Sequence, residues 1–224
     1  CSSSEWIFIF FTLNLFGYLI RLVEGRIETM TNIDELIDDV IEREGGYVNH
    51  LADRGGPTNW GITEPVARRQ GYVGDMRSLP RSDAAAIYKR LYWFKPRFDE
   101  VAGHVPALAA ELFDTGINMG TGTATAFLQR ALNALNREGR DYADLAIDRQ
   151  IGPATIAALR AFLRKRGKGG ESVLLKAVEA LQGAHYINIA EARPSQEAFV
   201  YGWLANRIGD AACPNALRHP REGG

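Results

Sequence analysis

A helical spacing of apolar residues runs through most of this chain and breaks in one place. Ile33, Ile37 and Val40 recur at intervals of three and four, which puts them on one face of a helix. The same spacing returns in later runs, near residues 63–69, 82–91, 105–117, 123–135, 153–163, 171–190 and 195–208. The break is the stretch EREGGYVNHLADRGGPTNWGIT, residues 42–63, whose glycines and proline favour turns and short strands. The sequence therefore predicts an α+β fold that is mainly α-helical, with a small β-hairpin region near residues 47–62.

Composition excludes several classes of function. The chain has 224 residues, 46% hydrophobic and 24% charged, which suits a globular protein with a sizeable core. Its net charge of -1 gives no broad electrostatic case for a nucleic-acid partner. Cys1 and Cys213 cannot make a disulfide framework or a four-ligand zinc site, and no HExxH motif occurs. We therefore expect no metal and no other cofactor.

Motifs of other enzyme classes are missing from the sequence. It contains no G-x-S-x-G, and a cysteine peptidase would have to use Cys213. The stretch GTGTATA, residues 120–126, has the look of a phosphate loop but no lysine follows it. The basic run RKRGKGGE, residues 164–171, is one short cluster, so a surface link is favoured over a DNA-binding element.

Two carboxyl groups in and beside the break suit the cleavage of a glycosidic bond. Such cleavage needs one carboxyl that holds a proton and one that is ionised. Glu44 continues the apolar helical row and is expected on its core-facing side, which favours a protonated acid. Asp53 lies in a glycine-rich polar loop and should stay ionised, and the Thr58 hydroxyl could orient a water molecule. The alternatives are a solvated helix-end carboxylate for Glu44 and a turn-capping role for Asp53.

A second group of residues is predicted to bind a substrate, with a structural alternative for each. The aromatic residues could stack on sugar faces or belong to the core, and Thr63 could contact substrate or cap a helix. Asp114 and Asn118 lie one helical turn apart and could line a cleft or satisfy buried backbone. The group comprises Tyr47, Trp60, Thr63, Tyr92, Trp93, Asp114 and Asn118.

The pattern EGGYVN…D-x-GG-x-T-x-x-GIT resembles the N-terminal signature of glycoside hydrolase family 108, the bacterial and phage N-acetylmuramidases, some called secretion activators. The stretches FDTGINMGTGTATAFLQRALN, IGPATIAAL and FVYGWLANRI are similar to the predicted peptidoglycan-binding domain that follows the catalytic part. The resemblance implies a lysozyme-like fold and an endolysin-like enzyme. It also implies cleavage of the β-1,4 bond between N-acetylmuramic acid and N-acetylglucosamine, with Glu44, Asp53 and Thr58 as catalytic residues. The alternatives are a non-catalytic peptidoglycan-binding or secretion-helper protein and a chitinase-like or chitosanase-like hydrolase.

The first residues are expected to lie outside the native fold. The apolar run that begins at Trp6 spans about 15 residues, fewer than a membrane-crossing helix needs, and it has no basic lead or cleavage site. Met30 is a natural start, so residues 1–29 are interpreted as a translated upstream segment, with a membrane anchor as the alternative. Residues 31–104 are then the catalytic region, residues 105–208 a helical peptidoglycan-binding region packed on it, and residues 209–224 a loose tail.

This organisation carries expectations about partners and location. We expect a monomer that binds peptidoglycan glycan strands and does not insert stably into a membrane. Without a signal peptide, it would stay in the cytoplasm until a holin-like pore or another export route released it to the cell wall in the periplasm.

Overall fold

The computed structural model describes residues 22–23, 26–27, 32–49 and 56–209. Asp53 and the segment 210–224 lie outside the described residues, as does most of the segment 1–29. The helices are α1 (Ile33–Glu44), α2 (Glu64–Arg69), α3 (Arg81–Tyr88), α4 (Phe98–Ala102), α5 (Pro106–Met119), α6 (Thr121–Ala134), α7 (Pro153–Arg166), α8 (Lys168–Ala192) and α9 (Glu197–Arg207). The strands are β1 (Leu22–Val23), β2 (Arg26–Ile27), β3 (Thr58–Asn59) and β4 (Ile62–Thr63). The predicted mainly helical, lysozyme-like α+β fold is confirmed.

Helix α1 begins and ends as its sequence predicts. The side chain of Asn32 accepts a hydrogen bond from the backbone N–H of Asp34 at 3.0 Å and donates one to Glu35 at 3.3 Å. The first of these bonds satisfies a backbone N–H that the first helical turn leaves without a partner, and the second joins the two side chains. Gly45, with a φ of 75°, ends the helix. The buried face comprises Ile37, Val40 and Ile41.

The break in helical periodicity forms a tight hairpin. Strands β3 and β4 pair antiparallel, with Thr58 opposite Thr63 and Asn59 opposite Ile62. The two residues between them, Trp60 and Gly61, both have positive φ, 54° and 73°. Positive φ at both positions is typical of a two-residue hairpin turn. Val48 adds a bridge to Thr58, which completes the small β region.

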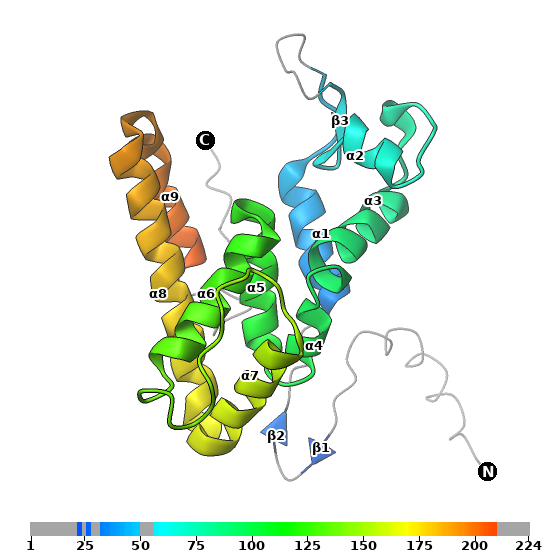
Figure 1. Cartoon of the computed structure of the whole chain (residues 1–224). Helices are drawn as coiled ribbons and strands as arrows, with labels where there is room; N and C mark the ends of the chain where they lie inside the picture. The colour runs from blue at the N-terminus through cyan, green and yellow to red at the C-terminus, as the bar shows by residue number, and fades with distance from the viewer. Residues whose placement is uncertain (1–21, 24–25, 28–31, 50–55, 210–224) are drawn as a thin grey trace, which may run out of the picture.

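Helix α5 is the central helix of the fold. It packs against α4, α6 and α8, and its Leu108, Leu112 and Phe113 are almost completely buried. The buried residues from Ile37 to Val178 form one continuous cluster, so both halves of the chain share a core. Figure 1 shows α5 in the middle, with α1 and the β3–β4 hairpin on one side and the antiparallel pair α8–α9 on the other. No helix in the described part of the chain is long and apolar enough to cross a membrane.

Candidate active site

Glu44 is the last residue of α1, and its side chain is exposed rather than core-facing. The expected burial is therefore not found, and the alternative of a solvent-exposed carboxylate at the helix end agrees with the structure. Ile37, Val40 and Ile41 are buried in the core. The helix continues past these residues to Glu44, and Gly45 then ends the helix. An exposed carboxyl at this position is accessible to a substrate from solution, which a core-facing one would not be.

The Glu44 side chain lies against the turn of the β3–β4 hairpin. A Cβ atom added at Gly61 would stand 2.8 Å from Glu44 Cγ and 2.4 Å from the Tyr88 hydroxyl oxygen. Both distances are too short for real atoms, so only glycine fits here, and its φ of 73° also favours glycine. The hairpin turn, α1 and α3 thus meet at a contact that fixes the stem of Glu44.

Tyr88 stabilises the contact between Glu44 and the hairpin turn from the buried side. Its ring is 4% exposed and its hydroxyl donates to the Trp60 carbonyl at 3.2 Å. Burial, followed by the nearby Glu44 carboxylate, raises the pKa of Tyr88, so its hydroxyl stays a proton donor at neutral pH. Nothing local in the sequence marks Tyr88, because Glu44 and Gly61, the residues that it meets, are distant in the chain.

Thr58 and Thr63 stand opposite each other on the hairpin, and both are half-buried. The neighbouring pair, Asn59 and Ile62, is buried on the other face, where the Asn59 amide donates to the Met76 carbonyl at 2.7 Å. Thr63 is the N-cap of α2, but its side chain makes no capping hydrogen bond. The capping alternative therefore does not use its hydroxyl, and the roles of both threonines stay predictions.

The predicted aromatic residues divide into two sets. Trp93 is 5% exposed and packs edge-on against Phe113, with ring centroids 6.1 Å apart, so it belongs to the core and offers no free face to a sugar. The other three are half-buried. The Arg77 guanidinium lies 5.4 Å from the Tyr47 ring, the Trp60 indole donates to the Leu79 carbonyl at 2.9 Å, and the Tyr92 ring lies 5.7 Å from that of Tyr88.

Asp114 links three helices beside the site. Its carboxylate accepts from Arg207 on α9 at 2.7 and 2.9 Å and pairs with Arg43 on α1 at 3.5 Å. Asn118 donates to the Asp114 carbonyl at 2.7 Å and to its carboxylate at 3.2 Å. Because Arg43 directly precedes Glu44, this link joins the last helix of the chain to the candidate acid. Substrate binding by Asp114 and Asn118 stays a prediction.

Glu111 is a carboxyl that the sequence analysis missed. It is buried on α5, and burial, followed by the charge of Asp114, raises its pKa to about 8. Gln182 on α8 donates to the Thr115 hydroxyl at 2.8 Å, and Thr115 donates to Glu111 at 3.1 Å. A glutamate inside an apolar helical row was the available signal. Its burial makes it part of the contact between α5 and α8, not an acid within reach of a glycan.

The described residues bring Glu44, Gly61, Tyr88 and the threonine-bearing hairpin together. They do not show Asp53, so the second acid stays a prediction. Among these same residues, no group of three or more His, Cys, Asp or Glu side chains could hold a metal ion.

Comparison with known proteins bears on this geometry. Residues 37–120 match the family model Glycosyl hydrolase 108, and residues 123–208 match the model Predicted Peptidoglycan domain. No curated protein matches the chain. Of the 10 matching chains of solved structure, one is SagA of Brucella abortus. It is 26% identical with a TM-score of 0.47, and the match covers 80% of this chain and 97% of that one.

The two family matches together support a glycosidase that degrades peptidoglycan. The first match ends after α5, beyond the predicted division near residue 105. The match thus includes helix α5, which bears Glu111 and Asp114, and the division near residue 105 stays a prediction. Residues 37–120 belong to the glycosyl hydrolase 108 family, and they are followed by a predicted peptidoglycan domain.

Proposed function

We propose that this protein is an N-acetylmuramidase, which hydrolyses the β-1,4 bond between N-acetylmuramic acid and N-acetylglucosamine in peptidoglycan. The observation that carries the proposal is Glu44 itself. It ends a helix of the glycosyl hydrolase region, its carboxyl is exposed, and its stem is held by Gly61 and Tyr88.

In the proposed reaction, Glu44 acts as the general acid. Its carboxyl gives a proton to the glycosidic oxygen while the bond between that oxygen and the anomeric carbon breaks. The Asp53 carboxylate, ionised before the reaction, positions a water molecule with Thr58 in support. The oxygen of that water bonds to the anomeric carbon, and its proton passes to a carboxylate, that of Asp53 for inversion or that of Glu44 for retention. Whether the anomeric configuration is inverted or retained depends on the distance between the two carboxyl groups.

The contact at Gly61 supports the role of Glu44. A catalytic acid must be held in place relative to the bond that it cleaves, because small displacements lower the rate steeply. The tight turn at Trp60 and Gly61, bonded to the Tyr88 hydroxyl, holds the hairpin against the stem of Glu44 and leaves the carboxyl open. The proposed enzyme acts as a monomer on the cell wall, which it reaches by a holin-like or other export route.

Glu44→Gln tests the acid. The substitution keeps the shape of the side chain but removes its transferable proton, and a positioned acid typically contributes about 10²–10⁴-fold. Lysis of purified cell walls should therefore fall by about 100-fold or more, with an unchanged melting temperature. Glu42→Gln is the matched control, since Glu42 is an exposed glutamate in the same last turn of α1.

Mass spectrometry of the released fragments tests the bond. Borohydride reduces the sugar at each new reducing end to its alcohol. A muramidase should give reduced N-acetylmuramic acid, whereas a glucosaminidase would give reduced N-acetylglucosamine. Cleavage of chitin oligomers without wall lysis would indicate a chitinase-like enzyme. Wall binding without any cleavage would indicate a non-catalytic helper.

A further inference from the structure

Three aromatic rings form a stack where α9 packs on α8. Phe199 and Trp203 lie one helical turn apart on α9, with ring centroids 6.0 Å apart and an angle of 23° between the rings. Trp203 in turn stacks on Tyr186 of α8 at 5.0 Å and 28°. Each outer ring is therefore stacked on the ring of Trp203, which lies between them in the series.

The stack runs from the core to the surface. Tyr186 is 3% exposed, Trp203 is half-buried and Phe199 is 54% exposed. Tyr186 and Trp203 form the ring contact between α8 and α9. The Phe199 ring is not part of that contact. More than half of Phe199 is exposed to water, and its ring is stacked on that of Trp203.

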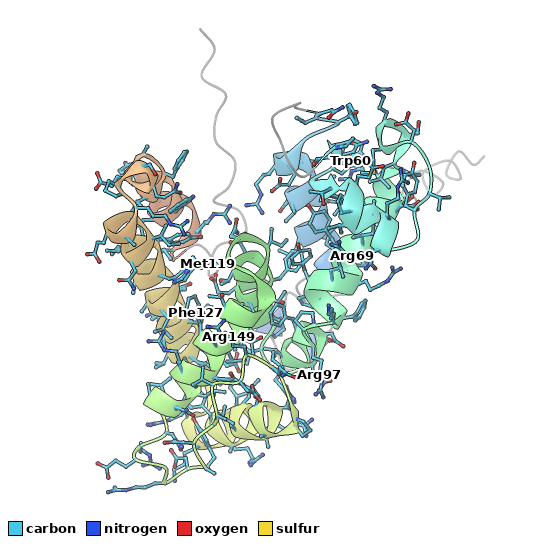
Figure 2. The ribbon with its side chains drawn as sticks, turned by 45° about the horizontal axis from the view of Figure 1, so that its top comes forward. Trp60, Arg69, Arg97, Met119, Phe127 and Arg149 are labelled. Carbon is cyan, nitrogen blue, oxygen red and sulfur yellow. The ribbon has the colours of Figure 1, made fainter. Side chains whose placement is uncertain are left out.

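The helix row that bears the stack ends at a residue linked to α1. Phe199, Trp203 and Arg207 follow each other at intervals of four, so they share one face of α9. Arg207 ends this row and binds the Asp114 carboxylate, which also pairs with Arg43, the residue before Glu44. Figure 2 shows Met119, the last residue of α5, between the lobe that carries Trp60 and the α8–α9 pair. The row therefore leads from the outer part of α9 toward the end of α1.

A planar aromatic face suits a sugar ring. One face of a pyranose in a β-1,4-linked glycan is lined by C–H groups, and an aromatic ring can cover that face while the hydroxyl groups stay in water. A stable contact with another protein needs about 800 Å² from each partner. The exposed rings that α9 offers are those of Phe199 and Tyr201, 54% and 85% exposed, and two rings fall far short of that area.

We propose that Phe199, backed by Trp203, is a glycan-binding subsite that holds a sugar ring of the strand some distance from the bond cleaved at Glu44. The ligand is a β-1,4-linked N-acetylated glycan, and this choice rests on the function proposed above. The subsite would act as a remote anchor, so it affects the binding of long strands more than that of short ones.

The test measures glycan binding by the full chain. Cosedimentation with purified peptidoglycan, and tryptophan fluorescence with short and long N-acetylglucosamine oligomers, are recorded in the Glu44→Gln background so that the strands stay intact. Adding Phe199→Ala should weaken binding of walls and long oligomers by about three- to tenfold. Short oligomers should bind as before, and Phe199→Tyr, which keeps the ring, should retain the affinity.

Tyr201→Ala is the matched control. Tyr201 lies on the same helix and is more exposed, at 85%, but it stands two residues away from the row. Equal binding by Phe199→Ala, Tyr201→Ala and the parent protein would overturn the subsite. A change of oligomeric state on Phe199→Ala, measured by light scattering, would overturn it in favour of a contact between copies.

The outcome is separable from that of the proposed function. If the wild-type protein cleaves walls but Phe199→Ala binds them normally, the subsite fails and the enzyme stands. If wild type cleaves nothing but Phe199→Ala weakens glycan binding, the subsite stands and the enzyme fails.

Discussion

Glu44 and Glu111 are carboxylic acids on two helices of the same core, but their surroundings are opposite. Glu44 is exposed, and its stem is fixed by a backbone turn that leaves no room for another atom. Glu111 is buried between helices, hydrogen-bonded to Thr115, and has its pKa raised to about 8. Perturbed pKa values often mark functional sites, but here the marked acid has no access to substrate. Access to solvent and a fixed stem favour Glu44 as the catalytic candidate. The burial of Glu111 indicates instead a carboxyl that affects stability.

Removing α5 and everything after it should have the largest effect. A chain that ends after Gly103 would expose Trp93, which packs on Phe113, together with the surface that Leu108 and Leu112 cover. From residue 31 onward about 75 residues would remain, which is small for an independent core. We expect an aggregated or unfolded product, measured by soluble yield and circular dichroism.

A chain that ends after Gly209 is the control for this truncation, since the core residues that the structure describes lie before that point. A soluble, lytic fragment ending after Gly103 would show that the region of Glu44 folds without the region of Glu111, and the two would then be independent.

Glu111 should make the stability of the protein depend on pH. Its pKa is about 8 in the folded protein and 4.5 as a free side chain, so the folded state holds the proton more tightly. The resulting stabilisation is fully present below about pH 4.5 and is lost as the pH rises to about 8, a decrease of roughly 3–5 kcal/mol at most. Urea unfolding of the wild type at several pH values measures this slope.

Glu111→Gln should flatten the pH dependence, because glutamine stays neutral and can still accept from Thr115. Glu42→Gln, at an exposed position, should leave the slope unchanged. If the Glu111→Gln protein shows the same pH dependence as wild type, another group causes that dependence. The assignment of a stability role to Glu111, in contrast to Glu44, would then be wrong.

Gly61→Ala should damage the site of Glu44 with a smaller effect on stability. The new Cβ would overlap the Tyr88 hydroxyl and the Glu44 stem, so the acid or the hairpin must move. We expect wall lysis to fall by about tenfold or more, since small displacements of a catalytic group are costly. Initial rates of turbidity loss measure the effect.

Gly71→Ala is the control that separates crowding from backbone strain. Gly71 also has a positive φ, 94°, but a Cβ there meets no atom within 4 Å. It should cost about 1 kcal/mol of stability and leave the lytic rate alone. If both alanine variants lose activity equally, the contact between Gly61 and Glu44 is not what orders the site.

The sequence predicted the parts of this comparison that depend on near neighbours. The apolar stripe of α1 is local, and it is found where it was expected. The Asn32 cap and the glycine that ends the helix likewise depend on adjacent residues. The turn-rich stretch was likewise predicted as a β region, because a β turn is specified by a few adjacent residues.

Contacts between distant residues were beyond the sequence alone. Periodicity places Glu44 on a row but does not say where the core beneath that row ends, so a core-facing and a solvent-exposed carboxyl both stayed open until the structure showed exposure. Trp93 could have faced a sugar or the core. Its contact with Phe113, which lies on another helix, places it in the core. The approach of Tyr88 and Gly61 joins segments 27 residues apart (88 minus 61), which no local pattern records. Asp53 lies outside the described residues, so its role remains a prediction.

Asp114→Asn should have the smallest effect and tests the link between the two regions. The carboxylate is already engaged by Arg43 and by Arg207, whose side chain is only 20% exposed, so losing its charge should cost about 1–2 kcal/mol of unfolding free energy. Glu138→Gln, which breaks the exposed pair with Arg140, is the control and should cost much less. Since the two arginines occupy the Asp114 carboxylate, we expect kcat on cell walls to fall a few-fold through movement of α1, with KM unchanged. The substrate contact predicted from the sequence gives the opposite pattern, a raised KM with unchanged stability. Urea unfolding together with lysis rates at several wall concentrations therefore decides whether Asp114 joins the two regions or belongs to the glycan site alone.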